Sequence, residues 1–597
     1  MSIAQRVHLK GTEKEREGNP GPFPGRSGGL SLRLRRWLPF LALGSLLFYL
    51  IVVPLLLLFV SSFKPEGFPF DPGFTLNHYF KAYLGSEFLP LLGRTLSFAL
   101  GSTLTALMIG TALAWLVERT DLPVRSLVRA LIILPMATPP LLLAIGWTML
   151  LSPRIGFFNT LLKDVFGLSQ APFNIYSLAG MIFVEGLSLT PSTFLILSPA
   201  FRNMDPNLEE AAMVSGAGVL RVLRRIILPM LWPAIMAAAV YLMIVCFLVF
   251  DIPGTIGMPA RIFVLSSKIF YLANESPSGV PLYGQVSALA IFFLAFLCVL
   301  GLLYQRLTAE AQRFVTITGR GYRARPYRLR QWRYPALGFL SVYFFLAVLA
   351  PLAILMWTSL TPYQAQVSIK MLSLLTLENH REFLGNRRVL EAARHSVTIA
   401  FFSATIVSIL SALISWVVVR SKSVGRRILD LLSFAPVAIP GVMMGVALTY
   451  VYLTISVVPI YGTIWIIAIA YITYYIAYGS RAFRGVMLQM HPELEEAGLM
   501  SGASWFRTLR KVTFPLIFPT VFSVWIWVMA HAMRELSSAL MLKGPNNVVL
   551  TTLLWDYWSG GEPNKAAATG VWLMMALVFV VAVWQFTSQR SSTRKVD

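Results

Sequence analysis

The fold is decided by a stretch that occurs twice, first as Asp205-Pro206-Asn207-Leu208-Glu209-Glu210-Ala211-Ala212-Met213-Val214-Ser215-Gly216. The second copy reads Pro492-Glu493-Leu494-Glu495-Glu496-Ala497-Gly498-Leu499-Met500-Ser501-Gly502. Matched positions lie 286 residues apart, as Glu210 and Glu496 do. Each copy is short and charged and lies between long apolar segments, so both copies are expected to do the same work.

Local signals predict a short helix, a turn and a second short helix in each copy. Pro206 and Pro492 suit the first helical position, where a missing N–H costs nothing. The acidic pairs that follow favour the positive end of the helix dipole. Gly216 and Gly502 permit the left-handed backbone that ends a helix. A basic helix and a proline follow, and we expect Pro229 and Pro515 to restart the chain as a membrane span.

Composition places the chain in a membrane. Of its 597 residues, 56% are hydrophobic and 13% charged, and the mean hydropathy is +0.68. Apolar runs of about 20 residues, the length that crosses a bilayer, recur along it. The net charge of +23 does not indicate nucleic acid, because the basic residues gather in short loops beside spans, as the positive-inside rule expects.

Twelve spans are predicted, so the fold class is an all-α membrane protein. Six form a first repeat (37–307), and six form a second (335–588). A disordered tail (1–36), a basic linker (308–334) and a C-terminal tail (589–597) complete the chain. The spans are expected at 37–62, 93–117, 127–151, 178–200, 229–252, 284–307, 335–360, 395–419, 428–455, 460–482, 515–540 and 570–588, with Pro135, Pro139 and Pro140 distorting the third.

An even number of spans per half gives the halves the same orientation, which is a parallel repeat. Trp115 and Arg119 match Trp416 and Arg420 at an offset of 301. Loop charges place both termini and both copies of the stretch on the cytoplasmic side. The outer loops are then 63–92, 152–174, 253–283, 361–394 and 541–569.

The chain lacks the residues of an ATP-hydrolysing or other catalytic site. No Gly-Lys dipeptide occurs, which excludes a Walker A loop. Neither HExxH nor CxxC is present, and Cys246 and Cys298 are not spaced as a metal or disulfide framework. We therefore expect no enzyme activity, no bound metal and no cofactor in this chain.

Four charged residues fall inside or at the ends of predicted spans: Glu185, Asp251, Arg534 and Glu535. Such charges are costly in a bilayer and commonly line a pathway. The alternative is an internal ion pair or an interfacial position. Tyrosines at 471, 474, 475 and 478 follow helical spacing, which favours packing between spans over the lining of a cavity.

The repeated stretch resembles the EAA loop of ABC-importer permeases. That pattern is Glu-Ala-Ala, three residues, Gly, nine residues, Ile, one residue and Leu-Pro; the first copy matches throughout, and the second departs at Gly498, Val512 and Phe514. The resemblance implies a type I ABC importer fold with an extracytoplasmic binding protein and two copies of an ATPase subunit that holds ATP and Mg²⁺. It implies that the ATPases contact the following residues: Glu209, Glu210, Ala211, Ala212, Gly216, Pro229, Glu495, Glu496, Ala497, Gly498, Gly502 and Pro515.

A finer resemblance is to the fused permeases of ferric-iron importers, carried by the stretches 173–177, 258–263 and 316–323. It implies a bacterial inner-membrane permease that imports ferric iron or an iron chelate by alternating access. Polyamines, thiamine, phosphonates and other small solutes stay open as substrates. A secondary transporter and a non-transport scaffold are the rival classes; matched charged stretches have no role in the former.

Overall fold

The computed structural model describes residues 40–204, 207–275, 280–313, 327–364, 367, 369–421, 425–455 and 459–593. The side chains of 207, 208, 210, 219, 220, 309–313, 369, 370, 505, 506 and 583–593 are not described. The predicted tail 1–36, residues 314–326 of the predicted linker and residues 594–597 of the predicted C-terminal tail lie outside these ranges.

The described part of the first half is helical throughout. In chain order its elements are η2 (Phe48–Val52), α2 (Val53–Ser61), α3 (Asn77–Tyr83), α4 (Phe88–Arg119), α5 (Arg125–Ile133), η3 (Leu134–Ala137), α6 (Pro140–Leu151), α7 (Phe157–Phe166), α8 (Leu178–Arg202), α9 (Asn207–Val214), α10 (Val219–Val222), η4 (Leu223–Ile227), α11 (Leu228–Leu248), η5 (Pro253–Gly257), η6 (Met258–Ala260), α12 (Leu265–Asn274) and α13 (Tyr283–Arg313).

The second half repeats this order. Its elements are η7 (Arg330–Trp332), α14 (Arg333–Phe344), η8 (Phe345–Leu349), α15 (Ala350–Ser359), α16 (Ile369–Leu372), α17 (Glu378–Gly385), α18 (Arg387–Arg420), α19 (Gly425–Phe434), η9 (Ala435–Ala438), α20 (Gly441–Thr454), α21 (Ile464–Gln489), α22 (Glu493–Met500), α23 (Trp505–Thr508), η10 (Leu509–Thr513), α24 (Phe514–Arg534), α25 (Ser537–Met541), α26 (Leu550–Ser559) and α27 (Pro563–Thr593).

Nine helices in the described ranges are long and apolar enough to cross a membrane, and counting three bent helix pairs as single spans raises this to 12. The nine correspond to nine of the predicted spans. Two of the bent pairs correspond to the predicted third and ninth spans. The predicted span at 460–482 is α21, a helix of 26 residues that packs along α18 as α8 packs along α4.

Prolines bend the third span of each half, which was predicted for the first half. The axis turns by 92° between η3 and α6 and by 113° between η9 and α20. Pro139 and Pro440 hold extended backbone at these bends, because a proline cannot donate the helical hydrogen bond and disfavours helix in the residue before it. Each half is therefore interrupted at the equivalent position of the repeat.

The first span of each half crosses to the other half. α2 packs against α20, and α15 packs against α6. On one side Tyr49 and Tyr452 join their hydroxyls at 3.3 Å. On the other side Gly146 lies so close to Pro351 that an added Cβ would stand 2.8 Å from the proline ring. The two halves are thus interlocked, and their contact includes the bent spans.

The prediction that 253–283 and 541–569 are outer loops is wrong in part. Within 253–283 and 541–569, the helices α12 and α26 fold back into the protein, and most of their residues are buried. Thr95 accepts a hydrogen bond from the backbone of Leu265 at 3.0 Å, and Ser396 accepts one from Leu550 at 2.8 Å. These buried side-chain oxygens satisfy helix N-termini that the sequence alone assigned to solvent.

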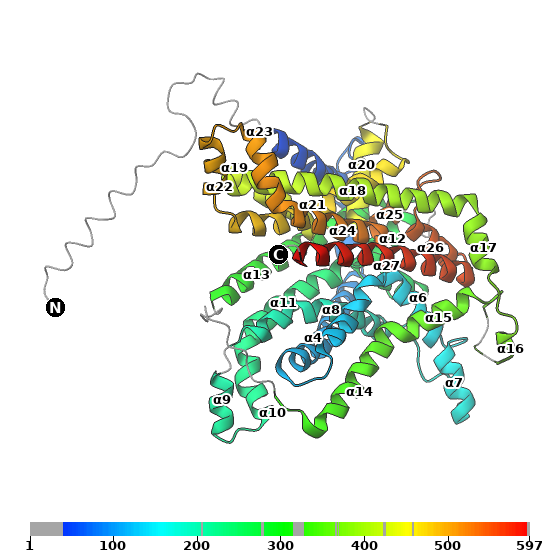
Figure 1. The fold of residues 1–597 in the computed structure, drawn as a ribbon. Coiled ribbons are helices and arrows are strands. Elements are labelled where there is room, and N and C mark those ends of the chain that lie inside the picture. The colour runs from blue at the N-terminus through cyan, green and yellow to red at the C-terminus, as the bar shows by residue number, and fades with distance from the viewer. Residues whose placement is uncertain are drawn as a thin grey trace.

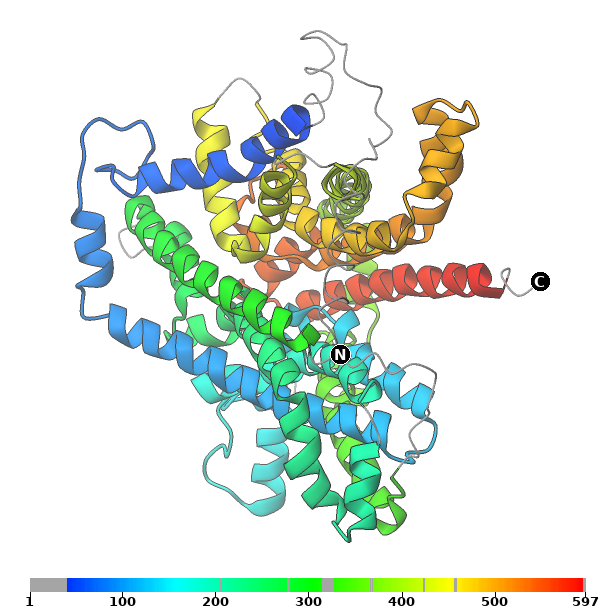
Figure 2. The ribbon, with the colours of Figure 1, turned by 90° about the vertical axis from the view of Figure 1, so that its left-hand side faces the viewer.

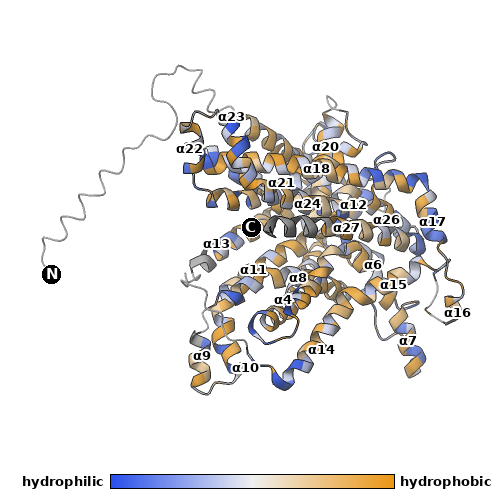
Figure 3. Ribbon diagram, viewed as in Figure 1, coloured by the Kyte–Doolittle hydropathy of each residue, from blue (hydrophilic) through white to orange (hydrophobic). Residues whose placement is uncertain are grey.

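Both copies of the repeated stretch lie at one end of the helix assembly, on the left in Figure 1, and the short helices α7, α16 and α17 lie at the opposite end. Viewed from that side, the two copies occupy separate positions, teal-green below and orange above (Figure 2). Hydrophilic residues gather at the two ends, around α22, α23 and α17, whereas the helices between are largely hydrophobic (Figure 3). This distribution suits a bilayer around the middle.

We expect Gly146→Ala to destabilise the protein by about 1–3 kcal/mol, because the new methyl group overpacks the contact between α6 and Pro351. Thermal unfolding of the purified chain in detergent measures this. Gly93→Ala in α4 is the matched control, since a Cβ there meets open space. Equal melting temperatures for the two variants would contradict the close crossing of the halves.

Candidate functional site

The two copies of the repeated stretch form matching elbows, here named elbow 1 (207–227) and elbow 2 (493–513). α9 ends in a Schellman motif, in which Ala217 N–H bonds the carbonyl of Ala212 at 3.0 Å and Gly216 N–H bonds that of Met213 at 3.0 Å. The equivalent bonds at the end of α22 run from 503 to 498 and from 502 to 499. Gly216 has φ +82° and Gly502 has φ +78°, so the predicted left-handed glycines are confirmed.

The junction between elbow and span differs from the prediction. Pro229 and Pro515 do not restart the chain. Instead, π-turns η4 and η10 continue directly into α11 and α24. Leu228 N–H bonds the carbonyl of Leu223, and Phe514 N–H bonds that of Leu509, five residues back. A proline lacks the N–H of the next ordinary helical bond, so the wider turn accommodates it. Each elbow is therefore continuous with a span.

One glutamate of each elbow, Glu209 in elbow 1 and its counterpart Glu495 in elbow 2, forms an ion pair with an arginine at the end of a long helix; Glu209 is buried and Glu495 is half-buried. In elbow 1, Glu209 is 3% exposed, forms an ion pair with Arg119 and accepts a hydrogen bond from the Tyr327 hydroxyl at 2.6 Å. In elbow 2, Glu495 pairs with Arg420 at 3.4 Å and accepts a hydrogen bond from Thr513 at 3.3 Å. Arg119 and Arg420 end α4 and α18, so each ion pair ties an elbow to a long span.

The remaining predicted coupling residues lie mostly on the surface. Glu496 is exposed, and the side chain of its counterpart Glu210 lies outside the described part. Val214 is the last residue of α9 and Met500 is the last residue of α22, and these residues are 90% and 89% exposed. Ala211, Gly216, Pro229, Ala497, Gly502 and Pro515 are exposed, whereas Ala212 and Gly498 are half-buried. Each elbow thus presents apolar and polar groups outward, while Glu209 and Glu495 face the arginines at the ends of α4 and α18.

Elbow 1 has a partner that the sequence did not reveal. Tyr327, beyond the undescribed part of the linker, pairs in parallel with Thr120: its N–H bonds the carbonyl of Arg119 at 2.8 Å, and its carbonyl accepts from Asp121 at 2.9 Å. Asp121 in turn accepts a hydrogen bond from Leu329 N–H at 2.8 Å. The end of the linker is therefore bound to the end of α4 and to Glu209 of elbow 1. A tyrosine within a run of arginines is the only sequence signal for this contact.

The four charged residues predicted in or near spans come together between the halves. Glu185 in α8 lies within electrostatic range of Asp251, which follows α11 and lies within range of Arg534 and Glu535 at the end of α24. Glu185 and Asp251 are buried, and Arg534 and Glu535 are half-buried. Here, "interior cluster" means these four residues. In the described part of the chain, no group of three or more His, Cys, Asp and Glu residues is arranged to hold a metal ion.

The second half supplies further polar neighbours to this cluster. Glu535 accepts hydrogen bonds from the Ser538 hydroxyl at 2.8 Å and backbone at 3.0 Å, and so caps α25. Tyr471 donates to the backbone carbonyl of Glu535 at 3.2 Å, and Tyr475 also lies close. Two of the tyrosines predicted to pack between spans therefore do so beside charged groups.

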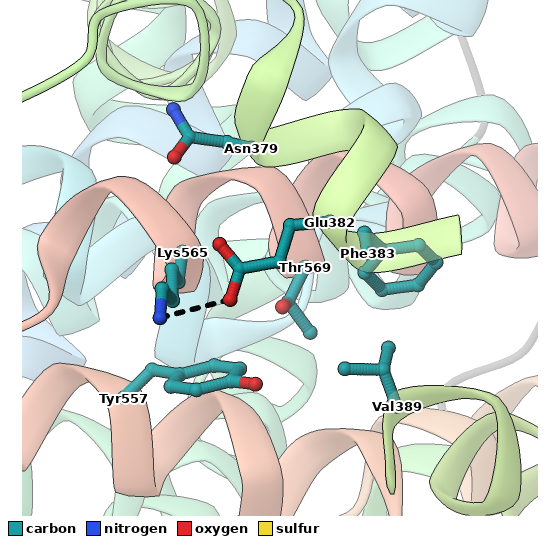
Figure 4. Close-up of a pocket in the computed structure, with 7 residues that line it drawn as sticks. All are labelled: Asn379, Glu382, Phe383, Val389, Tyr557, Lys565 and Thr569. Atoms are coloured by element: carbon teal, nitrogen blue, oxygen red, sulfur yellow. Dashed lines mark ion pairs between the residues drawn. The ribbon is translucent and has the colours of Figure 1, made fainter. Parts of the chain in front are cut away.

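The opposite end of the second half carries a small pocket (Figure 4). Glu382 of α17 pairs with Lys565 of α27 at 2.9 Å, and Glu562 pairs with the same ammonium group at 2.9 Å. Behind them, Phe383 stacks on Trp572 with ring centroids 5.5 Å apart. These contacts fasten α17 to α27 and give this end a charged surface.

Comparison with known families gives two matches. The family described as "Binding-protein-dependent transport system inner membrane component" matches residues 106–313 and again residues 404–594. Each match contains one elbow.

The chain is 25% identical over 546 residues to the ferric transport system permease protein FbpB of Actinobacillus pleuropneumoniae, covering 90% of this chain and 76% of that protein. It is 26% identical over 505 residues to a putative ferric transport system permease protein, FbpB 1, of Haemophilus influenzae, covering 83% and 76%. The spermidine/putrescine permease protein PotC of Escherichia coli K12 is 24% identical over 200 residues, covering 33% of this chain and 75% of PotC.

We expect Gly216→Ala to destabilise elbow 1 by about 1–2 kcal/mol, because an L-residue resists the left-handed backbone. Hydrogen–deuterium exchange of the α9 segment in detergent is the measurement. Gly218→Ala is the matched control: Gly218 lies in the same turn without a positive φ and has open space around it, and Ser504 holds its place in elbow 2. Faster exchange in both variants alike would contradict this role of Gly216.

Tyr327→Phe removes one hydrogen bond to a buried charge and is expected to weaken the attachment of elbow 1 by about 1.5–3 kcal/mol. Exchange should rise in α9 and stay unchanged in α22, since Tyr327 contacts elbow 1. Tyr334→Phe, at a position 77% exposed, should leave both segments unchanged. An unaltered α9 in the Tyr327 variant would show that the linker does not brace the elbow.

Proposed function

The chain belongs to the family of binding-protein-dependent transport system inner membrane components, and on that premise we propose that it carries both membrane-spanning halves of an ATP-driven solute importer. The observation that carries the proposal is the pair of elbows, which have equivalent backbone geometry, lie at one end of the assembly and are each continuous with a span. On this proposal the halves are the repeats 37–307 and 335–588, joined by the linker 308–334.

The elbows are the proposed contact sites for two copies of an ATPase subunit. Their outward groups, among them Val214, Glu496 and Met500, offer a mixed apolar and acidic surface to a groove in each partner. The ion pairs of Glu209 and Glu495 hold the elbows against α4 and α18. Closure of the ATPases on ATP and Mg²⁺ would then be transmitted through the π-turns into α11 and α24, which would alternate access between the two sides.

The elbow end is the proposed cytoplasmic side of a bacterial inner membrane. Basic residues support this orientation, since cytoplasmic loops are enriched in Lys and Arg. Arg221, Arg224 and Arg225 follow the first elbow helix, and Arg507, Arg510 and Lys511 follow the second. The opposite end, with α7, α16 and α17, then receives the extracytoplasmic binding protein, and both chain termini are cytoplasmic.

The best-supported substrate is ferric iron or an iron chelate. The FbpB proteins align with most of this chain, whereas the alignment with PotC covers one third of it. A polyamine is the second candidate because PotC aligns with one third of this chain. Thiamine, phosphonates and other small solutes have no observation that favours them here.

The double variant Glu210→Arg plus Glu496→Arg is expected to abolish uptake and to weaken ATPase co-purification about 10-fold or more, because a reversed charge in a desolvated contact costs several kcal/mol. Both properties are measured with the chain co-expressed with its cognate ATPase. Membrane insertion should be unchanged.

Glu378→Arg, an exposed charge reversal at the opposite end, controls for the charge change and should leave ATPase co-purification intact. Normal ATPase recruitment and transport by the double variant would refute the coupling role of the elbows.

A further inference from the structure

A surface helix of the first half occupies a connection that is much shorter in the second half. Residues 152–177 join α6 to α8 and include α7, whereas only residues 455–463 join α20 to α21. α7 lies at the side of the assembly, toward the end opposite the elbows (Figure 1). This helix is therefore an addition to the repeated fold and needs a role of its own.

An apolar stripe runs along one side of α7. The i, i+3, i+4, i+7 spacing of a single helix face is followed by Phe158, Leu161, Leu162 and Val165. The positions between them are polar: Asn159, Thr160, Lys163 and Asp164. Leu161 is 44% exposed and Val165 is 65% exposed, and Phe166 at the end of the helix is 67% exposed. A contiguous apolar face left exposed in this way marks an interaction surface.

Asn159 fixes which side of α7 faces outward. It is fully buried, and its side-chain amide donates hydrogen bonds to the carbonyls of Leu151 and Ser152, both at 3.0 Å. The same amide group donates to the carbonyl of Phe173 at 2.9 Å and accepts from its N–H at 3.1 Å. Two residues along a helix correspond to a rotation of about 200°, so Leu161 points away from the protein. The outward direction of the stripe is thus set by a buried polar contact.

The apolar stripe of α7 is continuous with the surface of a neighbouring span. Val342, Phe345 and Leu349 belong to the span Arg330–Ser359 and are 56%, 44% and 48% exposed. Apolar side chains exposed along a span contact acyl chains, which are as apolar as the side chains themselves. The ring of Phe158 packs beside that of Phe345, with centroids 6.4 Å apart. The exposed face of α7 therefore borders the surface that faces lipid.

We propose that α7 is an interfacial helix in the bilayer leaflet opposite the elbows, with Leu161 and Val165 among the acyl chains. The exposed Asp164 borders this face on the side of the headgroups. Amphipathic helices of this kind bury their apolar face about 5–10 Å into the boundary between headgroups and acyl chains. Because Asn159 binds the carbonyl of Leu151, the last residue of α6, α7 anchors the bent third span of the first half to the lipid. The binding protein of the proposed importer then docks on α16 and α17 at the same end.

Nitroxide labels on single cysteines test the position of α7 in the full chain, reconstituted in nanodiscs of phosphatidylethanolamine and phosphatidylglycerol. The background variant is Cys298→Ser, because Cys298 is exposed and Cys246 is buried. A label at Val165→Cys should collide readily with dissolved oxygen. Its collision rate with a water-soluble nickel chelate should be at least about 3-fold lower than that of a label at Asp164→Cys. Asp164→Cys is the matched control, since this neighbouring position is also exposed but is polar in the wild type.

Equal collision rates with the nickel chelate at the two positions would mean that the apolar face lies in water, and would overturn the proposal. Shielding of the Val165→Cys label that appears only after the binding protein is added would also overturn it, and would make α7 a docking site for that protein. Neither result bears on the elbows, because the measurement requires no ATPase.

Discussion

The proposed mechanism depends on two ion pairs. One joins the end of α4 to elbow 1, and the other joins the end of α18 to elbow 2. A short surface helix has little stability of its own, because nucleating a helix is unfavourable and few hydrogen bonds follow. Arg119 and Arg420 compensate by binding Glu209 and Glu495; the first pair is buried and the second is half-buried. Removing one partner of a buried pair such as Arg119–Glu209 costs about 3–5 kcal/mol, since the other charge stays uncompensated. A force applied to an elbow is therefore delivered to the span behind it.

The two halves share a backbone but have diverged in the side chains that face each other. Position 185 is a glutamate in α8, and the equivalent position in α21 is Tyr471. Glu209 is braced by Tyr327 from the linker, whereas Glu495 is contacted by Thr513 from its own elbow. One half therefore supplies buried carboxyl groups to the interface, and the other supplies phenols, Arg534 and Glu535. A single chain permits this asymmetry because each half is encoded separately.

The crossing of the first spans holds the two halves together. α2 and α15 each pack on the bent span of the other half, so the halves are joined at two related places. The bends at Pro139 and Pro440 create short helices whose ends lie inside the assembly. Backbone that leaves the helix within a bilayer is tolerated where protein surrounds it, and α12 and α26 satisfy the same condition through Thr95 and Ser396.

The sequence by itself determined the features that depend on local chemistry or on length. Apolar runs of bilayer length located the nine long helices, prolines located the bends, and Gly216 and Gly502 located the turns of the elbows, because each of these signals acts within a few residues. The features that depend on contacts between residues far apart in the chain could be seen only in the tertiary structure. It paired Glu209 and Glu495 with arginines about 90 and 75 residues away, folded α12 and α26 inward, and brought Glu185, Asp251, Arg534 and Glu535 into one region. Side-chain partners far apart in the chain leave no periodic trace in the sequence, so their meeting is set by the packing of whole helices.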